Sequence, residues 1–270
     1  MVSLNLLSVT DGRYDIEASA RPFLSPTGPK SMLGALHYNN DLYPLWGQLD
    51  ACVRNGDQVI PKDNHLGFDP EKTRHFVLGM HSRALGMAPS LIPAIPINGH
   101  SRLLDVACGP ATFSRHLLAA NPGLNATAFD LPPILEISEE LTRASDVGER
   151  MTFHPGDYHS DTLPTGFDAA LYCGALHQES QDSALDVFQK IHTALDAGGS
   201  AFIVDLMTNR DRTAPVMSTL FSLNMLLTSP SGEVFSDTDT MSLLEEAGFT
   251  NLSRTEAPGT PYWIITAKKA

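Results

Sequence analysis

Short apolar runs alternate with amphipathic segments throughout the second half of the chain. This alternation predicts strands and helices in turn, which is the pattern of βαβ units around a parallel sheet. The last two apolar runs have no helical segment between them, so we expect an antiparallel pair at the end of the sheet. The sequence therefore predicts an α/β fold with a doubly wound sheet. We expect strands at 103–106, 126–129, 151–154, 169–173, 201–206, 251–256 and 262–267, and helices at 111–120, 134–144, 182–195, 216–227 and 238–247.

The first hundred residues follow a different pattern. Residues 6–16 place Asp11 and Gly12 between two apolar stretches, which predicts a hairpin with an Asp-Gly turn. A helical run follows, and a second predicted helix at 70–87 ends before the proline-rich segment 89–96. Because a two-stranded hairpin cannot bury its own apolar face, we expect this region to dock on another surface. The helical run carries an apolar stripe made of Leu36, Leu42, Leu45, Trp46, Leu49 and Val53.

Composition and charge narrow the classes of function. A chain of 270 residues can bury the core of one large α/β domain and add a smaller appendage. The formal net charge of −13 opposes a phosphate backbone, so we expect no nucleic-acid partner. Three widely spaced cysteines and the lack of an HExxH pattern predict neither a disulfide framework nor a metal site. The sequence has no signal-peptide pattern and no long apolar run, so we expect a cytoplasmic protein without membrane contact.

Residues 103–112 (LLDVACGPAT) begin as an apolar run and continue into a turn of small residues. A helical pattern follows this turn. Asp130 ends the next apolar run, where a carboxylate can bind ribose hydroxyls, so the pair predicts an adenosine-containing cofactor. A nicotinamide fingerprint needs three glycines, but Ala107 and Ala111 occupy two of those positions. Asp105 would repel a pyrophosphate and attract the cationic amino group of a methionyl moiety. The loop therefore favours S-adenosylmethionine (SAM).

Further motifs occur in an order that resembles a known family. After the loop come Phe129-Asp130-Leu131-Pro132, Gly156-Asp157-Tyr158, Leu176-His177 and Ala197-Gly198-Gly199. Their order and spacing are similar to those of the SAM-dependent small-molecule O-methyltransferases, which include caffeate-type, acetylserotonin and bacterial polyketide enzymes. The resemblance covers residues 30–268 and implies a Rossmann-like class I methyltransferase fold.

The resemblance implies three parts of the chain. Residues 1–29 resemble the wing of the family's winged-helix dimerisation domain, with most of that domain's helices missing, as in a truncated or short variant. Residues 30–98 would form a helical linker and substrate cap, and residues 99–270 the SAM-binding catalytic domain. The hairpin and the helix bearing Trp46 would leave apolar faces uncovered, so we expect a homodimer built around residues 1–60.

The resemblance also implies how the cofactor is held. Gly109 and its neighbours would hold the methionyl end, Asp130 would bind the ribose hydroxyls, and Asp157 and Tyr158 would flank the adenine. On the residues alone, Asp157 as a turn former and Tyr158 as a surface aromatic remain open. The implied cofactor-binding set is Asp105, Ala107, Gly109, Asp130, Leu131, Asp157, Tyr158 and Cys173.

His177 matches the position of the family's general base, just past the end of a predicted strand. The implied reaction moves a methyl group from SAM to a hydroxyl oxygen of a small aromatic or polyketide-like molecule, and the base removes the hydroxyl proton. A carboxylate that orients the imidazole would strengthen this base, and Asp205 is the candidate. The alternative for Asp205 is a cap of the following loop. Glu233 is a second candidate acid, near a loop expected to close over the substrate.

Two departures from the family pattern bear on function. Many members have His-Asp-Trp where this chain has His177-Gln178-Glu179, and a lysine where Cys173 stands. These differences leave open an enzyme that uses the fold and cofactor for chemistry other than methyl transfer. A non-catalytic scaffold that pairs with a longer homologue also remains open. Four side chains are expected at the acceptor wall, with plain core packing as the alternative: Phe76, Met80, Asn224 and Met225.

Overall fold

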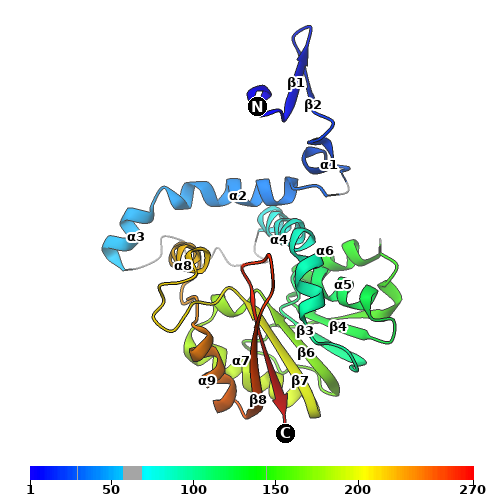
Figure 1. Ribbon diagram of the computed structural model, residues 1–270, viewed down its shortest axis with the longest axis vertical. Helices are drawn as coiled ribbons and strands as arrows, with labels where there is room; N and C mark the ends of the chain where they lie inside the picture. Colours follow the sequence, from blue (N-terminus) through cyan, green and yellow to red (C-terminus); the bar gives the residue numbers. More distant parts are fainter. Residues whose placement is uncertain (29, 57–68, 144) are drawn as a thin grey trace.

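A seven-stranded sheet forms the centre of the computed structural model, which describes residues 1–28, 30–56, 69–143 and 145–270. The strand order is β5-β4-β3-β6-β7-β9-β8, and the first five strands in this order are parallel (Figure 1). β9 pairs antiparallel with both β7 and β8, which confirms the predicted α/β fold and its terminal antiparallel pair. The strands are β3 (Arg102–Val106), β4 (Asn125–Asp130), β5 (Met151–Pro155), β6 (Phe167–Cys173), β7 (Leu195–Asp205), β8 (Phe249–Glu256) and β9 (Trp263–Lys269).

Helices cover both faces of this sheet. On one face, α7 and α9 lie over a buried cluster in which Phe188 packs with Tyr172 and Ile203. On the other face, Leu117 of α5 and Leu91 at the end of α4 belong to a second buried cluster. The helices are α4 (Pro70–Leu91), α5 (Thr112–Ala120), α6 (Pro132–Arg143), α7 (Gln181–Ala194), α8 (Val216–Thr228) and α9 (Asp237–Glu246). Short 3-10 helices occur at Val2–Leu4, Ile92–Ala94, Gly148–Arg150 and Leu176–Gln178. The last residue of the predicted helix 134–144 lies outside the described residues.

The connection from β5 to β6 at residues 156–166 contains no helix. It begins at Gly156, where an added Cβ would lie 2.5 Å from the ring of Phe129, so only glycine fits without a shift of the ring. It then follows α7, because the ammonium group of Lys190 donates to the carbonyls of Tyr158 (2.7 Å) and His159 (3.0 Å). The crossover therefore begins at the edge where the parallel strands end and follows α7 to the start of β6, where the N–H of Gly166 donates to the carbonyl of Ala194 at 3.1 Å.

The N-terminal region forms the predicted hairpin and then helices. β1 (Leu7–Thr10) and β2 (Arg13–Ile16) pair antiparallel, and Figure 1 shows the hairpin standing away from the sheet. A short helix α1 (Arg21–Leu24) leads to α2 (Leu33–Trp46), which contacts both α4 and α8. α2 therefore lies over the same edge of the sheet as α4 and α8.

Two expectations for the N-terminal helices are wrong in detail. The predicted helical stripe is divided, because α2 ends at Trp46 and α3 (Leu49–Asn55) begins after Gly47, a weak helix former that follows Pro44 closely. The helix expected to stop before the proline-rich segment runs through Pro89 to Leu91. A proline in the last turn removes one backbone hydrogen bond, and the burial of Ala88 and Leu91 offsets that loss.

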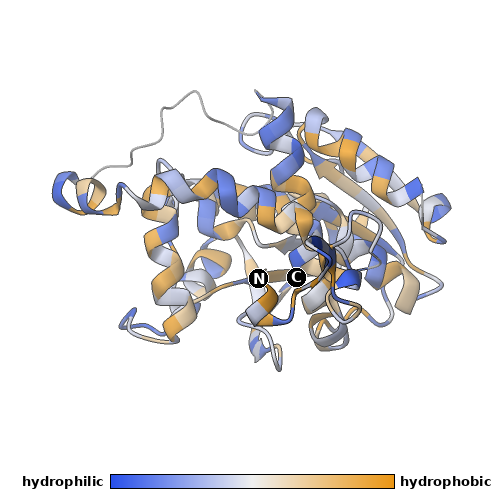
Figure 2. Cartoon of the chain, turned by 90° about the horizontal axis from the view of Figure 1, so that it is seen from above, coloured by the Kyte–Doolittle hydropathy of each residue, from blue (hydrophilic) through white to orange (hydrophobic). Residues whose placement is uncertain are grey.

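Hydrophilic and hydrophobic segments alternate along the helices in the view from above (Figure 2). Within the described ranges, no helix combines the length and the apolar character that a membrane span requires. Amphipathic helices of this kind bury one face and expose the other.

Candidate functional site

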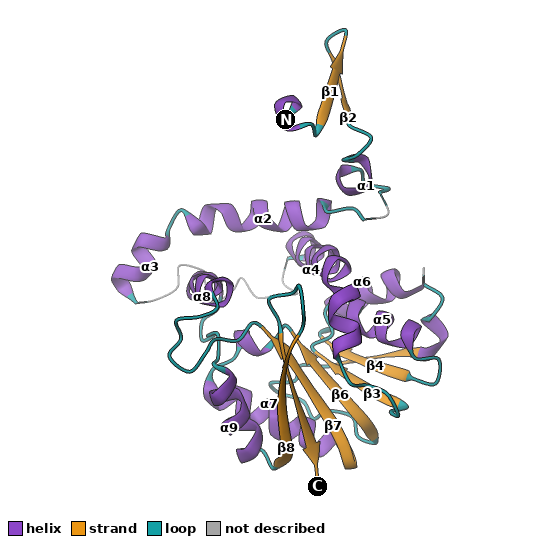
Figure 3. Ribbon diagram, in the orientation of Figure 1, coloured by secondary structure: helices purple, strands orange, loops and turns teal. Residues whose placement is uncertain are grey.

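The carboxyl ends of the central strands face α4 and α8 (Figure 3). In an open α/β sheet, ligands bind at this edge, where the direction of strand order reverses. β3 is flanked by β4 on one side and β6 on the other, so the reversal lies at the loops that follow β3 and β6. Four of the predicted site residues end strands here: Asp130 on β4, Cys173 on β6, Asp205 on β7 and, one residue before the end of β3, Asp105.

The loop after β3 has an unusual backbone. Ala107, Gly109 and Ala111 all adopt the left-handed region, with φ of 55°, 52° and 51°. For an alanine this conformation costs about 1–2 kcal/mol, so two such residues indicate a loop whose shape is fixed by its surroundings. The N–H of Gly109 donates to Oδ2 of Asp130 at 2.8 Å. A Cβ added to Gly109 would meet nothing within 4 Å, so the loop borders open space.

Asp105 and Asp130 are buried carboxyl groups with different donors. The hydroxyl of Ser114 donates to Asp105, whereas Asp130 accepts the N–H groups of Gly109 and Leu131, each at 2.8 Å. Burial raises the pKa of Asp105 to about 7 and that of Asp130 to about 6, and the two backbone bonds limit the rise at Asp130. Each oxygen of Asp130 keeps a lone pair that a ligand hydroxyl can use.

Cys173 lies beside these carboxyl groups at the end of β6. Burial raises the pKa of its thiol well above the ordinary value, and the neighbouring Asp105 and Asp205 raise it further. The pKa of Cys108, in the loop, is raised for the same reason, and the charges of Asp130 and then Asp105 raise it further. Both thiols therefore stay protonated at neutral pH and contribute small apolar surface rather than charge.

His177 and Asp205 are in direct contact. His177 lies in the 3-10 helix Leu176–Gln178 after β6, and its Nδ1 is 2.7 Å from Oδ1 of Asp205. The other carboxylate oxygen accepts the backbone N–H of His177 at 3.2 Å, so Asp205 holds both the ring and the chain of this residue. The N–H of Leu206 completes the bonds to Asp205, whose side chain is 1% exposed. Because a carboxylate only accepts, Nδ1 carries a proton, and in the neutral imidazole Nε2 then has the lone pair.

Phe221 is a site residue that the sequence analysis missed. Its ring meets the ring of His177 edge to face, with centroids 4.9 Å apart and planes at 89°. Phe221 lies on α8, three and four residues before Asn224 and Met225, so the three side chains share one helix face. That spacing is the signal that could have identified it. Asn224 is partly buried and Met225 is buried, and Asn224 donates a long bond to Thr228 (3.5 Å).

The other two predicted wall residues lie on α4. Phe76 meets the ring of Tyr38 edge to face at 5.5 Å and packs on the small cluster that contains Ile134 and Ile137. Met80 is partly buried one turn further along α4. Phe76 thus packs against α2 and α6, and its side chain stays partly exposed.

Glu233 bonds to other residues than the candidate base. Its carboxylate is 2.7 Å from Nη1 of Arg212 and accepts a long bond from Gln181 (3.5 Å). Among the described residues, none of the hydrogen bonds of His177 goes to Glu233. Of the two candidate acids, Asp205 is therefore the one in contact with His177.

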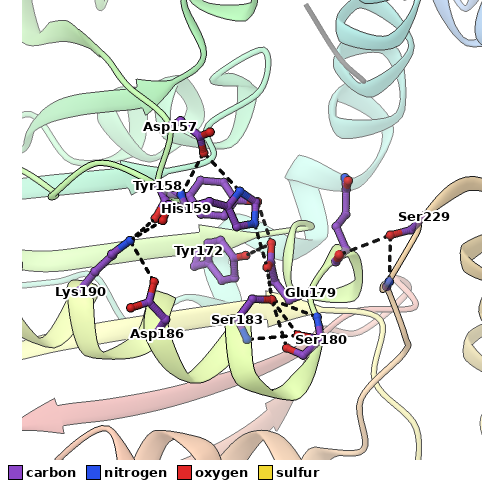
Figure 4. A network of polar contacts seen from close by, with 12 residues as sticks. Asp157, Tyr158, His159, Tyr172, Glu179, Ser180, Ser183, Asp186, Lys190 and Ser229 are labelled. Atoms are coloured by element: carbon purple, nitrogen blue, oxygen red, sulfur yellow. Dashed lines mark hydrogen bonds and ion pairs between the residues drawn. The ribbon is translucent and has the colours of Figure 1, made fainter. Parts of the chain in front are cut away.

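A polar network surrounds Glu179 (Figure 4). The carboxylate of Glu179 accepts bonds from the hydroxyls of Tyr158 (2.8 Å) and Ser183 (2.6 Å) and lies 3.1 Å from Nε2 of His159. Asp157 accepts the N–H of His159 at 2.9 Å and is more exposed. The ring of Tyr158 packs inward against the core, so it is not the surface aromatic that the sequence left open.

The residues at this edge fit SAM. A strained loop bordering open space, a buried carboxylate with free lone pairs and a second buried acid suit a ligand with ribose hydroxyls and a cationic amino acid. In the described ranges, no group of three or more His, Cys, Asp and Glu side chains is arranged to hold a metal ion.

Comparisons with known proteins agree with this geometry. Residues 46–250 match the model of the O-methyltransferase domain family. The tetracenomycin polyketide synthesis 8-O-methyl transferase TcmO of Streptomyces glaucescens is 31% identical over 221 residues, which is 81% of this chain and 65% of that protein. The match therefore spans less than two thirds of that relative's length.

Two further relatives extend the comparison. The L-tyrosine C(3)-methyltransferase of Streptomyces lavendulae is 29% identical, with 98% of this chain and 76% of that protein covered. The solved structure described as PigF with SAH, the demethylated product of SAM, has a TM-score of 0.86 and 26% identity. The match covers 99% of this chain and 82% of the PigF chain. PigF is a SAM-dependent methyl transferase of Serratia.

Proposed function

The chain belongs to the O-methyltransferase domain family, and we propose that it transfers a methyl group to a hydroxyl oxygen of a small aromatic or polyketide-like molecule. As a member of this family, it is a SAM-dependent methyltransferase that acts on small molecules. The choice of an oxygen acceptor is supported by the relative TcmO, an 8-O-methyl transferase of polyketide synthesis. The relative that methylates C3 of L-tyrosine makes a ring carbon the second candidate acceptor.

The contact between His177 and Asp205 carries the proposal. SAM, when bound, supplies the methyl group. The task left to the chain is to take the proton from the acceptor hydroxyl as the oxygen becomes the nucleophile. With Nδ1 bonded to Asp205 at 2.7 Å, Nε2 of His177 has the lone pair that accepts this proton. Asp205 stabilises the resulting imidazolium, and the edge of Phe221 fixes the ring plane.

The proposed cofactor contacts follow the edge of the sheet. Asp130 accepts the ribose hydroxyls, and Asp157 and Tyr158 flank the adenine. The methionyl part lies over the loop of Ala107 and Gly109. Asp105, Leu131 and Cys173 complete this set, and Phe76, Met80, Asn224 and Met225 form the acceptor wall.

We also propose a homodimer built around residues 1–60, with residues 1–29 as part of a dimerisation domain and residues 30–98 as the cap of the catalytic domain. Large apolar side chains on the hairpin and on α2 support it, because each would lose about 1.5–3 kcal/mol of burial by staying in water. The exposed ones include Val9, Tyr14, Leu36, Tyr43 and Trp46. A self-complementary pairing would cover them around a two-fold axis.

The experiment that tests the proposed reaction uses SAM labelled in its methyl group and a panel of acceptors. The panel contains phenols, hydroxylated polyketides and matched compounds in which the hydroxyl is replaced by hydrogen. We expect label in the phenolic or polyketide products only, with mass spectrometry locating it on oxygen. Label on carbon would replace the proposal with C-methylation. Binding of SAM without any transfer would instead favour other chemistry or a scaffold role.

A further inference from the structure

Glu179 is a buried carboxylate that the proposed reaction does not use. Its side chain is 1% exposed, and it lies between the 3-10 helix of His177 and the start of α7. Both of its oxygens are occupied: Oε1 by the hydroxyl of Tyr158 and Oε2 by His159 and Ser183 (Figure 4). A buried carboxylate is costly unless it is paired and hydrogen-bonded, and this one has a complete set of donors.

The donors keep Glu179 ionised. Burial raises the pKa of its carboxyl group, but the bonds from His159, Ser183 and Tyr158 outweigh burial and hold the pKa below its ordinary value. The bond to Glu179 in turn raises the pKa of His159. The raised pKa of His159 and the lowered pKa of Glu179 both favour the charged form of the pair. Its orientation is fixed by Ser183, which also belongs to the capping box of α7.

Glu179 fixes a segment that comes from a distant strand. Tyr158 and His159 follow β5, whereas Glu179 follows β6, and two strands separate β5 from β6 in the sheet. The ring of Tyr158 meets that of buried Tyr172 at 82° with centroids 6.2 Å apart, and the ring of His159 lies 4.3 Å from it on another side. Lys190 holds the carbonyls of the same two residues. The segment is therefore anchored through its side chains and its backbone.

The anchored segment begins beside Asp130, the carboxylate proposed to bind the ribose of the cofactor. The N–H of Gly156 donates to the backbone carbonyl of Asp130 at 3.0 Å, so the two residues after Gly156 are joined to the strand end that carries Asp130. The charges of Asp157 and Asp130 lie close enough for the first to raise the pKa of the second. A ligand that reaches from Asp130 to Asp157 therefore ends next to Tyr158, the residue that follows Asp157 in the chain.

We propose that Glu179 is a positioning residue of the cofactor site, which holds the rings of Tyr158 and His159 as the wall that the adenine base contacts. The inference rests on the proposed placement of the adenine beside Asp157 and Tyr158. The carboxylate acts on the adenine base indirectly. It supplies the wall by fixing a ring from the neighbouring loop.

Two variants test the inference by binding, without a known acceptor. Glu179→Gln keeps the side-chain volume and removes the charge, and Tyr158→Phe keeps the ring and removes only the hydroxyl donor. The probes are SAH and 5′-methylthioadenosine, which lacks the amino-acid part, measured by calorimetry. Because bonds to a charged group are lost, we expect Glu179→Gln to raise both dissociation constants about tenfold, and Tyr158→Phe to raise them by a smaller factor. The double variant should be less than additive, since both changes break one contact.

Asp182→Asn is the matched control. Asp182 is exposed in the first turn of α7, so the variant removes a carboxylate from the same helix without touching Glu179 or the bonds of Lys190 that hold the Tyr158–His159 segment. We expect unchanged dissociation constants for this control. Once an acceptor is known, Glu179→Gln should raise the KM for SAM and leave kcat within about twofold, because the residue acts on binding rather than on the transition state.

The outcomes separate this inference from the site on which it rests. Dissociation constants that stay at the wild-type value in Glu179→Gln and Tyr158→Phe, with only a lower melting temperature, would show a purely structural role and overturn the inference. If Asp130→Asn also leaves SAH binding unchanged, the cofactor placement itself is wrong. If Asp130→Asn weakens binding and the two wall variants do not, only the role of Glu179 fails.

Discussion

Replacing Asp130 by asparagine tests the cofactor site directly. The variant keeps the shape of the side chain but turns one carboxylate oxygen into an amide N–H group. The native oxygens each accept a backbone N–H, from Gly109 and from Leu131, at 2.8 Å. In the variant, one of these N–H groups faces another donor, and the proposed ribose hydroxyls lose a charged acceptor.

The geometry sets the size of the effect. A hydrogen bond to a charged group contributes about 1.5–3 kcal/mol, so we expect the Kd for SAH to rise about 10- to 150-fold. The free energy of unfolding should also fall, by about 1–3 kcal/mol, because a buried N–H loses its acceptor. The two effects are separable, since the first concerns the ligand complex and the second the empty protein.

The raised pKa of Asp130 adds a pH dependence with a definite sign. Burial raises this pKa from 3.8 to about 6, so the carboxylate charge is present above that pH and is lost below it. The affinity of the wild-type protein for SAH should therefore fall as the pH is lowered through about 6, and the variant should lack this step. For the empty protein the sign is opposite. The folded chain binds the proton more readily than the unfolded chain, so Asp130 contributes most stability at low pH and loses that contribution between pH 3.8 and about 6.

Calorimetric titration with SAH and thermal unfolding measure the two effects. Asp168→Asn is the matched control, because Asp168 accepts the N–H groups of Ser101 and Arg102, each at 2.9 Å, where β3 begins, at the opposite edge of the sheet. The control should lose stability and keep its affinity for SAH. An Asp130→Asn variant that binds SAH as the wild type does, at every pH tested, would refute the placement of the ribose.

Three further predictions concern the base, the crossover and assembly. With an acceptor in hand, His177→Gln should lower kcat about 10²- to 10⁴-fold and leave SAH binding unchanged, and Asp205→Asn should give a smaller loss. Wild-type turnover in both would place the base elsewhere. Gly156→Ala should lower the free energy of unfolding by about 1–3 kcal/mol, since its Cβ would lie 2.5 Å from the Phe129 ring; an unchanged melting temperature would contradict this. Light scattering should report twice the chain mass, and deletion of residues 1–30 should give a monomer or an aggregate. A stable monomer of the full chain at high concentration would exclude the proposed dimer.

The sheet could be predicted from the sequence because buried parallel strands are continuously apolar. The expected strand 103–106 is β3 but for one residue, and the expected strand 169–173 is β6 without its first two residues. Helix ends were harder to predict. Pro89 predicted the end of a helix, but the burial of Leu91 stabilises the helix beyond it. The spacing of the apolar residues on either side of Gly47 predicted one helix, but the helix ends before this glycine. Local propensity therefore failed where packing at a distance decided the outcome.

The site could be predicted in part. Motif order indicated Asp130 and His177, and strand ends indicated Asp205, because parallel strands bring their carboxyl ends to one edge. The position of Phe221 on His177 depends on how α8 packs over that edge, which no local pattern states. The role of Glu179 also could not be predicted from the sequence. A glutamate next to a helix start is usually exposed, and its burial depends on Tyr158 and His159 from a loop that follows β5.

The carboxyl groups at this edge differ in their hydrogen-bond donors, and the donors account for much of the difference in their ionisation. Asp105 has one hydroxyl donor and its pKa is raised to about 7, whereas Asp130 has two backbone donors and its pKa is raised to about 6. Glu179 is also buried, but with His159 and two hydroxyls as donors its pKa is lowered. A sequence shows which acids end strands, but the donors come from loops after other strands. At neutral pH, Glu179 thus carries its charge, whereas the pKa of Asp105 lies close to neutral pH, beside the proposed methionyl end of the cofactor.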